Sequence, residues 1–182
     1  KIPKKIKAKK IKKKIFKPKV STPKKNEPSE NKSDNFQGNI KIPDVNNKVV
    51  IYRDKWHIPH IYAENNKDLF LSQGYIHAQD RIWQMEMNRR IGQGKLAEAF
   101  GKDALNTDRL TRTIGFNRLA KEDYRLLSSK YKIYINSYVK GINVWLEKNK
   151  LPIEFRLSKI NPEPWTVLDV LSWGRVLTWT LS

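Results

Sequence analysis

Apolar residues gather into two short extended runs near residue 50 and recur at helical spacing afterwards. The run Val49-Val50-Ile51-Tyr52 is β-branched and aromatic, the segment 53–55 has turn composition, and residues 58–63 form a second extended run. This pattern predicts an N-terminal β-hairpin. Pro59 cannot donate a hydrogen bond to a strand ladder, so we expect it at a sheet edge or at the start of a strand.

A long helix is predicted directly after the hairpin. Asn65 or Asn66 can cap its first turn. Apolar or small residues then recur at helical spacing along two adjoining lines of the helix surface. The first line comprises Leu69, Ile76, Trp83 and Met87, and the second comprises Phe70, Gly74, Ala78, Ile82 and Met85. The small residues within these lines, Gly74 above all, would let another element approach closely. We expect Gly92 and Gly94 to break the helix.

Most of the remaining chain is predicted to be helical. The expected helices cover about residues 95–100, 103–114, 118–127, 130–148 and 165–182. An apolar stripe in the longest of them is typical of a core-facing helix; its members are Tyr131, Tyr134, Tyr138, Ile142 and Trp145. Residues 151–164, interrupted by prolines, are predicted to form a loop. The fragment is therefore expected to be mainly α-helical with an N-terminal β-hairpin.

Charge is concentrated at one end of the chain. The protein has 37 Lys and Arg against 18 Asp and Glu, a formal net charge of +19. Residues 1–43 carry +12 of this, and residues 1–25 hold thirteen Lys and no acid. This composition predicts a disordered Lys-rich tail and linker over 1–43, followed by a domain over 44–182. The tail is either solvated or, given Ile6, Ile11 and Ile15 at roughly helical spacing, a weak helix on anionic lipid.

The Lys-rich tail leaves an alternative function open, in which the chain is a basic module that binds nucleic acid or an anionic membrane. The rest of the chain, residues 44–182, is called the body below. The absence of Cys excludes a disulfide framework, a thiolate metal site and a Cys nucleophile. No run approaches the roughly 20 apolar residues that a transmembrane helix needs.

The titratable residues of the body offer little self-contained chemistry. His57 and His60 are three apart in an extended segment, where they face opposite sides and make a poor metal pair. His77 could join Asp80 as an acid–base pair at helical i, i+3 spacing, or could make an ordinary structural hydrogen bond.

Two short segments of the long helix, 80–81 and 88–90, are denser in polar groups than a solvated face needs. They are interpreted as members of a buried ionic network that holds the helices together.

A series of ordered blocks in the body resembles the penicillin acylase family. The blocks are the run from Arg53 to Ala63, Asp68-Leu69-Phe70, Gln73-Gly74-Tyr75, the run from His77 to Arg81, Trp83-Gln84-Met85-Glu86, Asn88-Arg89-Arg90, Gly92-Gln93-Gly94, Leu96-Ala97-Glu98, Phe100-Gly101, Asp108-Arg109, the run from Arg112 to Gly115, the run from Tyr138 to Asn143, the run from Leu151 to Phe155, the run from Pro162 to Trp165, Asp169 and Trp173-Gly174. The resemblance covers about residues 49–182 and leaves the Lys-rich tail without a counterpart. His57 stands where the family usually has Gly, which bears on the shape of the local turn.

The resemblance implies an α+β fold, the αββα fold of N-terminal nucleophile hydrolases. It implies an amidohydrolase that cleaves N-acyl amide bonds and is made as one precursor, exported, and self-cleaved into an α chain and a larger β chain. Residues 44–182 would be the α-chain region, truncated at its C-terminal end. The nucleophile would be the N-terminal Ser of the β chain, downstream of residue 182, so no catalytic residue is assigned within this chain. The implied partners are that β chain and a small N-acyl amide, in an extracytoplasmic location.

The same resemblance places substrate against the last predicted helix. Leu177 and Leu181 share one face and would line the acyl pocket, with Trp179 or Thr180 at its mouth. The alternative is that both leucines are core residues. No metal ligand is assigned here, because the family's calcium would be bound through residues outside this part. Contact of residues 1–25 with an anionic membrane stays open, and nucleic acid is not an expected partner.

Overall fold

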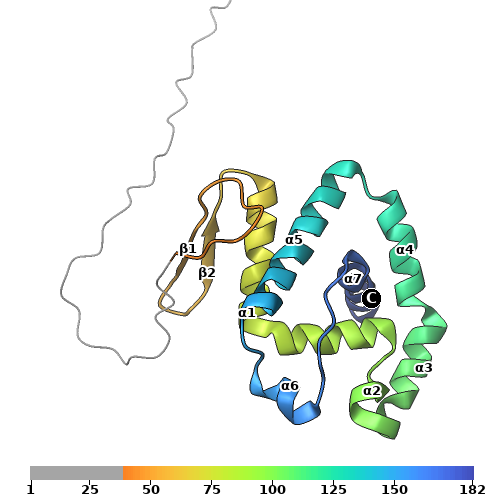
Figure 1. Cartoon of the computed structure of the whole chain (residues 1–182). Coiled ribbons are helices and arrows are strands. Elements are labelled where there is room, and N and C mark those ends of the chain that lie inside the picture. Colours follow the sequence, from red (N-terminus) through yellow and green to blue (C-terminus); the bar gives the residue numbers. More distant parts are fainter. Residues whose placement is uncertain (1–38) are drawn as a thin grey trace, which may run out of the picture. The chain divides into compact units, whose positions relative to one another are not determined.

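In the computed structural model, which describes residues 39–182, the two extended runs pair as an antiparallel hairpin (Figure 1). Strands β1 (Val50–Arg53) and β2 (Pro59–Tyr62) place Tyr52 opposite His60. Pro59 is the first residue of β2, which confirms the expectation for this proline. His57 in the connecting turn has a positive φ of 62°, a backbone conformation that favours glycine.

The helices that follow are α1 (Asn66–Gln93), α2 (Ala97–Phe100), a 3₁₀ helix η1 (Gly101–Ala104), α3 (Leu105–Ile114), α4 (Phe116–Leu126), α5 (Ser129–Lys148), α6 (Ile153–Ser158) and α7 (Val167–Thr180). The prediction of a mainly helical fragment with an N-terminal hairpin is confirmed. Helix α6 was expected to be a loop, since its six residues are too few to show a helical period. It is held by Phe155, which is buried and meets the Trp83 ring edge-on at 5.1 Å.

Helix α1 is capped as expected but is not straight. The Asn65 side chain accepts a hydrogen bond from the Asp68 N–H at 2.9 Å. The backbone at Arg81 leaves the helical region (φ −142°, ψ 21°), and the helix turns sharply there (Figure 1). The helix also continues through Gly92, contrary to expectation, and ends at Gly94, whose φ of 65° suits a left-handed C-cap.

The core forms where the first half of α1 packs along α5. Its buried residues come from α1, α5, α6 and the segment before α7; they are Tyr75, Ile76, Ala78, Ile82, Val139, Ile142, Val144, Trp145, Phe155, Ile160 and Trp165. The apolar stripe predicted for α5 is confirmed at Ile142 and Trp145, which are buried. It is wrong at Tyr131, which is exposed because α5 extends beyond the core at its first turn.

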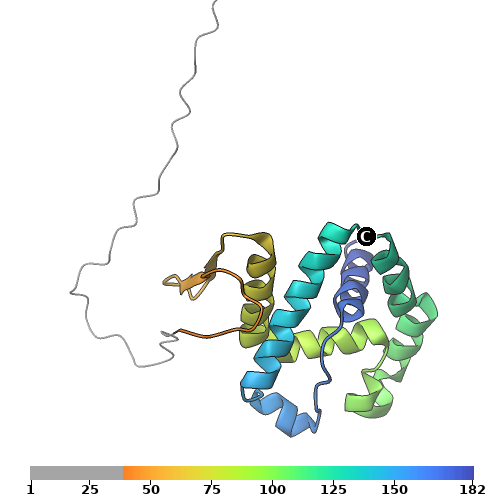
Figure 2. The same ribbon diagram turned by 45° about the horizontal axis from the view of Figure 1, so that its top comes forward.

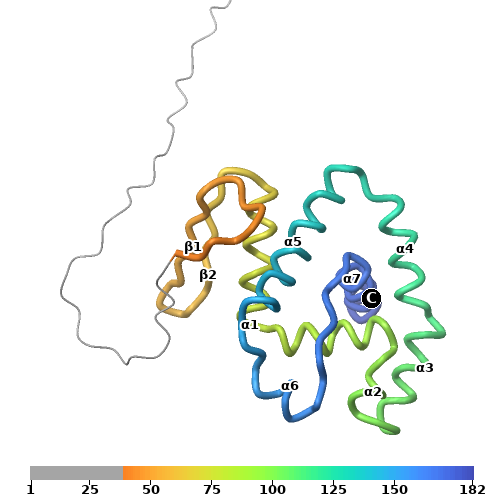
Figure 3. Tube along the Cα trace, in the orientation of Figure 1, coloured from red at the N-terminus to blue at the C-terminus, as the bar shows by residue number. Residues whose placement is uncertain are grey.

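Helix α7 lies between α4 and α5, and the second half of α1 crosses beside it (Figures 2 and 3). It begins at Val167 rather than Trp165, since Thr166 takes the N-cap position.

The compact unit of the described chain starts at Ile40, a few residues before the predicted boundary at 44. Ile42 packs against the core, and the Lys41 carbonyl accepts a hydrogen bond from Lys148 Nζ at 2.7 Å. The rest of the predicted tail, including residues 1–25, lies outside the described residues. Among residues 39–182, no helix combines the length and the apolar character needed to cross a membrane.

Candidate functional site

The three residues predicted to border an acyl pocket lie at the C-terminal end of α7. Leu177, Trp179 and Leu181 are 43%, 52% and 84% exposed. Among residues 39–182 neither leucine is buried. The acyl-pocket and core alternatives for these two leucines both stay predictions. The end of α7 therefore presents apolar side chains to whatever lies outside it.

The start of α7 is held by a capping box. Asp169 accepts hydrogen bonds at one carboxylate oxygen from the Thr166 N–H (2.7 Å) and the Thr166 hydroxyl (2.9 Å). Its other oxygen accepts from the Gln93 amide at 2.5 Å. Because the buried carboxylate joins α7 to the end of α1, it fixes the position of the first turn of α7.

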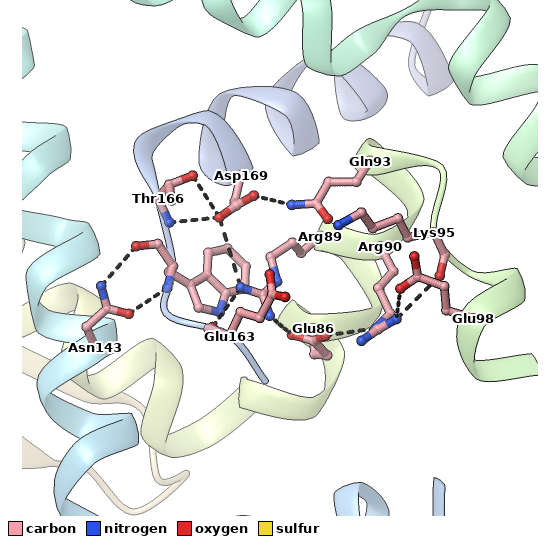
Figure 4. Close-up of polar contacts among 11 residues, drawn as sticks. Glu86, Arg89, Arg90, Gln93, Lys95, Glu98, Asn143, Glu163, Thr166 and Asp169 are labelled. Carbon is pink, nitrogen blue, oxygen red and sulfur yellow. Dashed lines mark hydrogen bonds and ion pairs between the residues drawn. The ribbon is translucent and has the colours of Figure 1, made fainter. Parts of the chain in front are cut away.

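Next to this cap lies a buried ionic network (Figure 4). Glu86, only 1% exposed, accepts from Arg89 Nη2 at 2.5 Å and from Arg90 Nε at 2.8 Å. Arg90 also donates to Glu98 at 3.1 Å, which ties α2 to α1. Each charge is paired, as burial of ionic groups requires.

Arg89 connects this network to the segment that leads into α7. Its Nη1 donates to the Glu163 carbonyl at 2.9 Å and lies 4.0 Å from Asp169 (Figure 4). Its guanidinium stands 5.1 Å from the Trp165 ring centroid. The Asn143 side chain of α5 donates through Nδ2 to the Trp165 carbonyl at 2.9 Å and accepts at Oδ1 from the Trp165 N–H at 2.7 Å. The position of α7 is thus fixed by both α1 and α5.

The predicted network is confirmed at Arg89 and Arg90 and wrong at residues 80–81. Arg81 is exposed, and Asp80 instead forms a two-point ion pair with Arg53 of β1 at 2.6 and 3.0 Å. The carboxylates of the network, Glu86 and Asp169, were not predicted. Sequence spacing could have found them, since Glu86 is three and four residues before the two arginines and Asp169 is three after Thr166.

The middle and end of α7 are held by a hydrogen bond, an ion pair and a contact between two aromatic rings. The Ser172 hydroxyl donates to the Gly92 carbonyl at 2.9 Å. Arg175 donates through Nε to Asp123 of α4 at 2.6 Å, and this guanidinium lowers the pKa of the Asp123 carboxyl. The Trp179 ring lies 5.9 Å from that of Phe116. Leu177 and Leu181 are therefore exposed on a helix whose orientation is fixed along its length.

Among the described residues, His77 and His60 each contact one hydrogen-bonding side chain. His77 does not bond Asp80; its Nδ1 lies 2.9 Å from the Tyr138 hydroxyl, and burial lowers the pKa of His77 against a smaller opposite effect of Asp80. Burial also raises the pKa of Tyr138 to about 12. His60 pairs with Asp54 at 3.1 Å. Among residues 39–182 no group of three or more His, Cys, Asp or Glu gathers that could hold a metal ion.

The hydroxyls of Ser137, Ser172 and Thr178 each donate to a backbone carbonyl. What the site offers is an apolar helix end on a rigid frame, suited to cover part of an apolar group.

The family profile described as penicillin amidase matches residues 48–182. The chain is 39% identical over 129 residues to the penicillin acylase 2 proenzyme of Pseudomonas sp. (strain SE83), covering 70% of this chain and 17% of that protein. It is 35% identical to penicillin G acylase of Escherichia coli, covering 68% of this chain and 15% of that protein. It is 32% identical to an acyl-homoserine lactone acylase of Pseudomonas syringae, covering 80% of this chain and 18% of that protein. The chain thus spans less than a fifth of the length of these relatives.

The structure resembles thermostable penicillin G acylase from Alcaligenes faecalis with a TM-score of 0.66 and 26% identity, over 74% of this chain and 75% of that one. This likeness confirms the predicted fold class, a mainly helical part of an αββα N-terminal nucleophile hydrolase. The family profile spans the residues that form the hairpin and α1 to α7. The chain belongs to the penicillin amidase family.

Proposed function

We propose that this chain is the α-chain portion of an amidohydrolase that cleaves N-acyl amide bonds, and that the end of α7 borders its acyl pocket. The observation that carries the proposal is the exposure of Leu177, Trp179 and Leu181 on a helix fixed by Asp169 and Arg175. The names of the relatives, penicillin acylases and acyl-homoserine lactone acylases, share one substrate chemistry, an acyl group on an amide nitrogen.

In the proposed reaction, the nucleophile is a Ser at the N-terminus of a β chain downstream of residue 182. Its hydroxyl needs a base, and its own α-amino group, with a reference pKa of about 7.7–8.0, is partly neutral at working pH. The Ser oxygen attacks the acyl carbonyl, the amine leaves with a proton, and water then releases the acid from the acyl-enzyme. Donors outside this chain would stabilise the oxyanion.

This chain's own contribution would be to bind the acyl group and exclude water from it. Each methylene buried against Leu177 or Leu181 contributes about 0.8 kcal/mol to substrate binding. The proposed partner is the β chain, in line with the name proenzyme of one relative, and the proposed location is extracytoplasmic.

The proposal is tested by expressing the complete precursor and analysing it by mass spectrometry. We expect two chains, the second beginning with Ser, and release of acid from a panel of acyl amides of increasing chain length. A precursor that stays one chain and hydrolyses none of the panel would overturn the proposal.

The pocket assignment is tested separately with Leu177→Ala and Leu181→Ala in the precursor. We expect KM for longer acyl chains to rise about threefold to tenfold, because each change removes apolar contact area. The matched control is Leu157→Ala, an exposed leucine on α6. Equal KM values for both pocket variants and the control would rule out a pocket role for the end of α7.

A second proposal is favoured by the thirteen Lys and no acid in residues 1–25. We propose that this segment contacts an anionic membrane, where each Lys near the surface contributes about 1 kcal/mol. The test is sedimentation with vesicles of mixed anionic and neutral lipid, comparing the full chain with a variant that lacks residues 1–38. This deletion retains Lys41 and Ile42, which belong to the compact unit. Binding that persists after the deletion, or that appears equally with neutral vesicles, would contradict the proposal.

A further inference from the structure

Among residues 39–182, the outer edge of strand β1 has backbone groups without backbone partners. The Asp54 N–H donates to the Ile58 carbonyl at 3.1 Å, so residues 54 and 58 form a hydrogen-bonded pair of the ladder. Hydrogen-bonded pairs alternate along antiparallel strands, and Tyr52 opposite His60 is the next one. The N–H and C=O groups of Ile51 and Arg53 therefore point away from β2, and no described backbone group outside the hairpin pairs with them.

The two edges of the hairpin are not equivalent. On β2 the outward residues are Pro59 and Ile61, and Pro59 has no N–H to offer. Strand β2 also packs against α1. On β1 both outward residues, Ile51 and Arg53, keep their N–H groups. A further strand can therefore add to the β1 edge far better than to the β2 edge.

The side chains of β1 point to the same conclusion. Val50, Ile51 and Tyr52 are 48%, 37% and 47% exposed, and because strand side chains alternate, both faces of β1 are uncovered. The strand is nonetheless a continuous apolar run, which is typical of a strand buried on both faces. An apolar edge strand left in this state is prone to pair with other chains. The sequence of β1 is thus suited to the interior of a larger sheet.

We infer that the β1 edge receives a strand from the part of the proenzyme that lies outside this chain. The matched region is 17% and 15% of two relatives, so most of such an enzyme is available to supply that strand. Residues 1–25 are a poor alternative, since their thirteen Lys would repel one another in a ladder beside Arg53. The inference rests on the proposed two-chain enzyme. It adds that a strand from outside this chain pairs with the edge of β1.

The direct test is residue-resolved hydrogen exchange on the complete, processed protein. We expect the Ile51 and Arg53 amides to exchange at least about 100-fold more slowly than an unstructured chain, like the Tyr52 amide within the hairpin. Fast exchange at Ile51 and Arg53 beside a protected Tyr52 would overturn the inference. Loss of their protection on dilution, or on deletion of residues 1–38, would assign the edge to a second copy or to that segment and would equally overturn it.

A pair of variants tests the backbone group itself. Ile51→Pro removes the outward N–H, and Ile51→Thr keeps it on a β-branched residue. We expect Ile51→Pro to lower the melting temperature of the processed protein by several degrees more than Ile51→Thr; equal effects would contradict the inference. The exchange pattern does not depend on activity. A protected edge in an inactive protein would count against the proposed function alone, and an unprotected edge in an active one against this inference alone.

Discussion

The backbone of Gly74 in α1 lies directly against the carbonyl oxygen of Tyr138 in α5. A Cβ atom at position 74 would stand 1.9 Å from that oxygen, and one at Gly141 would stand 1.9 Å from the Leu71 carbonyl oxygen. The two helices therefore cross with their backbones in contact at two reciprocal glycines. This contact fixes the frame on which the second half of α1 and α7 are built.

Replacing Gly74 by Ala should destabilise the protein by about 2–3 kcal/mol, because the added methyl group would overlap the backbone carbonyl of Tyr138. The control is Gly174→Ala in α7, where nothing lies within 4 Å of an added Cβ. That change should stabilise the helix by up to about 1 kcal/mol. Urea unfolding of both variants measures the difference, and similar effects would show that the helices do not pack so closely.

Replacing Glu86 by Gln should cost about 3–5 kcal/mol, because it leaves Arg89 buried without its counter-charge. Glu122→Gln is the matched control, since Glu122 also pairs with an arginine three residues on, Arg125, but at the surface. Its effect should stay below about 1 kcal/mol. Thermal and urea unfolding measure both. Equal losses in the two variants would argue against a buried network.

Replacing Asp68 by Asn should remove a pH-dependent part of the stability. Burial alone would raise the pKa of Asp68, but hydrogen bonds from the N–H groups of Asn46 and Asn47 and from the Asn65 side chain together lower it. A carboxyl whose pKa is lower in the folded state stabilises that state at pH values above its unfolded pKa of about 3.9. This contribution is lost as the pH falls through the lower, folded-state pKa.

The Asp68→Asn variant should therefore be less stable than the wild type at pH 7, and the gap should close as pH falls below about 3.9. Urea midpoints at a series of pH values between 7 and 2 measure it. Asp103→Asn, at an exposed site in η1, provides the control. A gap of constant size over that range would show that the Asp68 contacts do not depend on its charge.

Replacing His57 by Gly should stabilise the hairpin turn by about 0.5–1 kcal/mol. A side chain at a positive φ costs about 1–2 kcal/mol, and the greater freedom of Gly in the unfolded chain offsets part of the gain. His57→Ala keeps the Cβ and removes only the ring, so it should bring no such gain. A comparable rise in melting temperature for Ala would assign the effect to the imidazole instead of the backbone.

Local patterns predicted the parts of the fold that depend on neighbouring residues. The Pro59 position, the Asn65 cap and the small residue Gly74 on the packing face follow from steric and hydrogen-bonding properties of single residues. Local patterns did not predict helix α6 or the bend at Arg81. Helix α6 is too short to show a helical period, and Arg81 has helical neighbours on both sides.

For the candidate site, the order of residue types was enough to indicate the family and the residues at the end of α7. The three-dimensional arrangement was needed to show that Leu177 and Leu181 are exposed among the described residues, and that Asp169 and Glu86, 83 residues apart, act in one buried network. It likewise decided which edge of the hairpin is open. Burial and charge pairing depend on which distant elements meet, and that information is not carried by the spacing of residues along the chain.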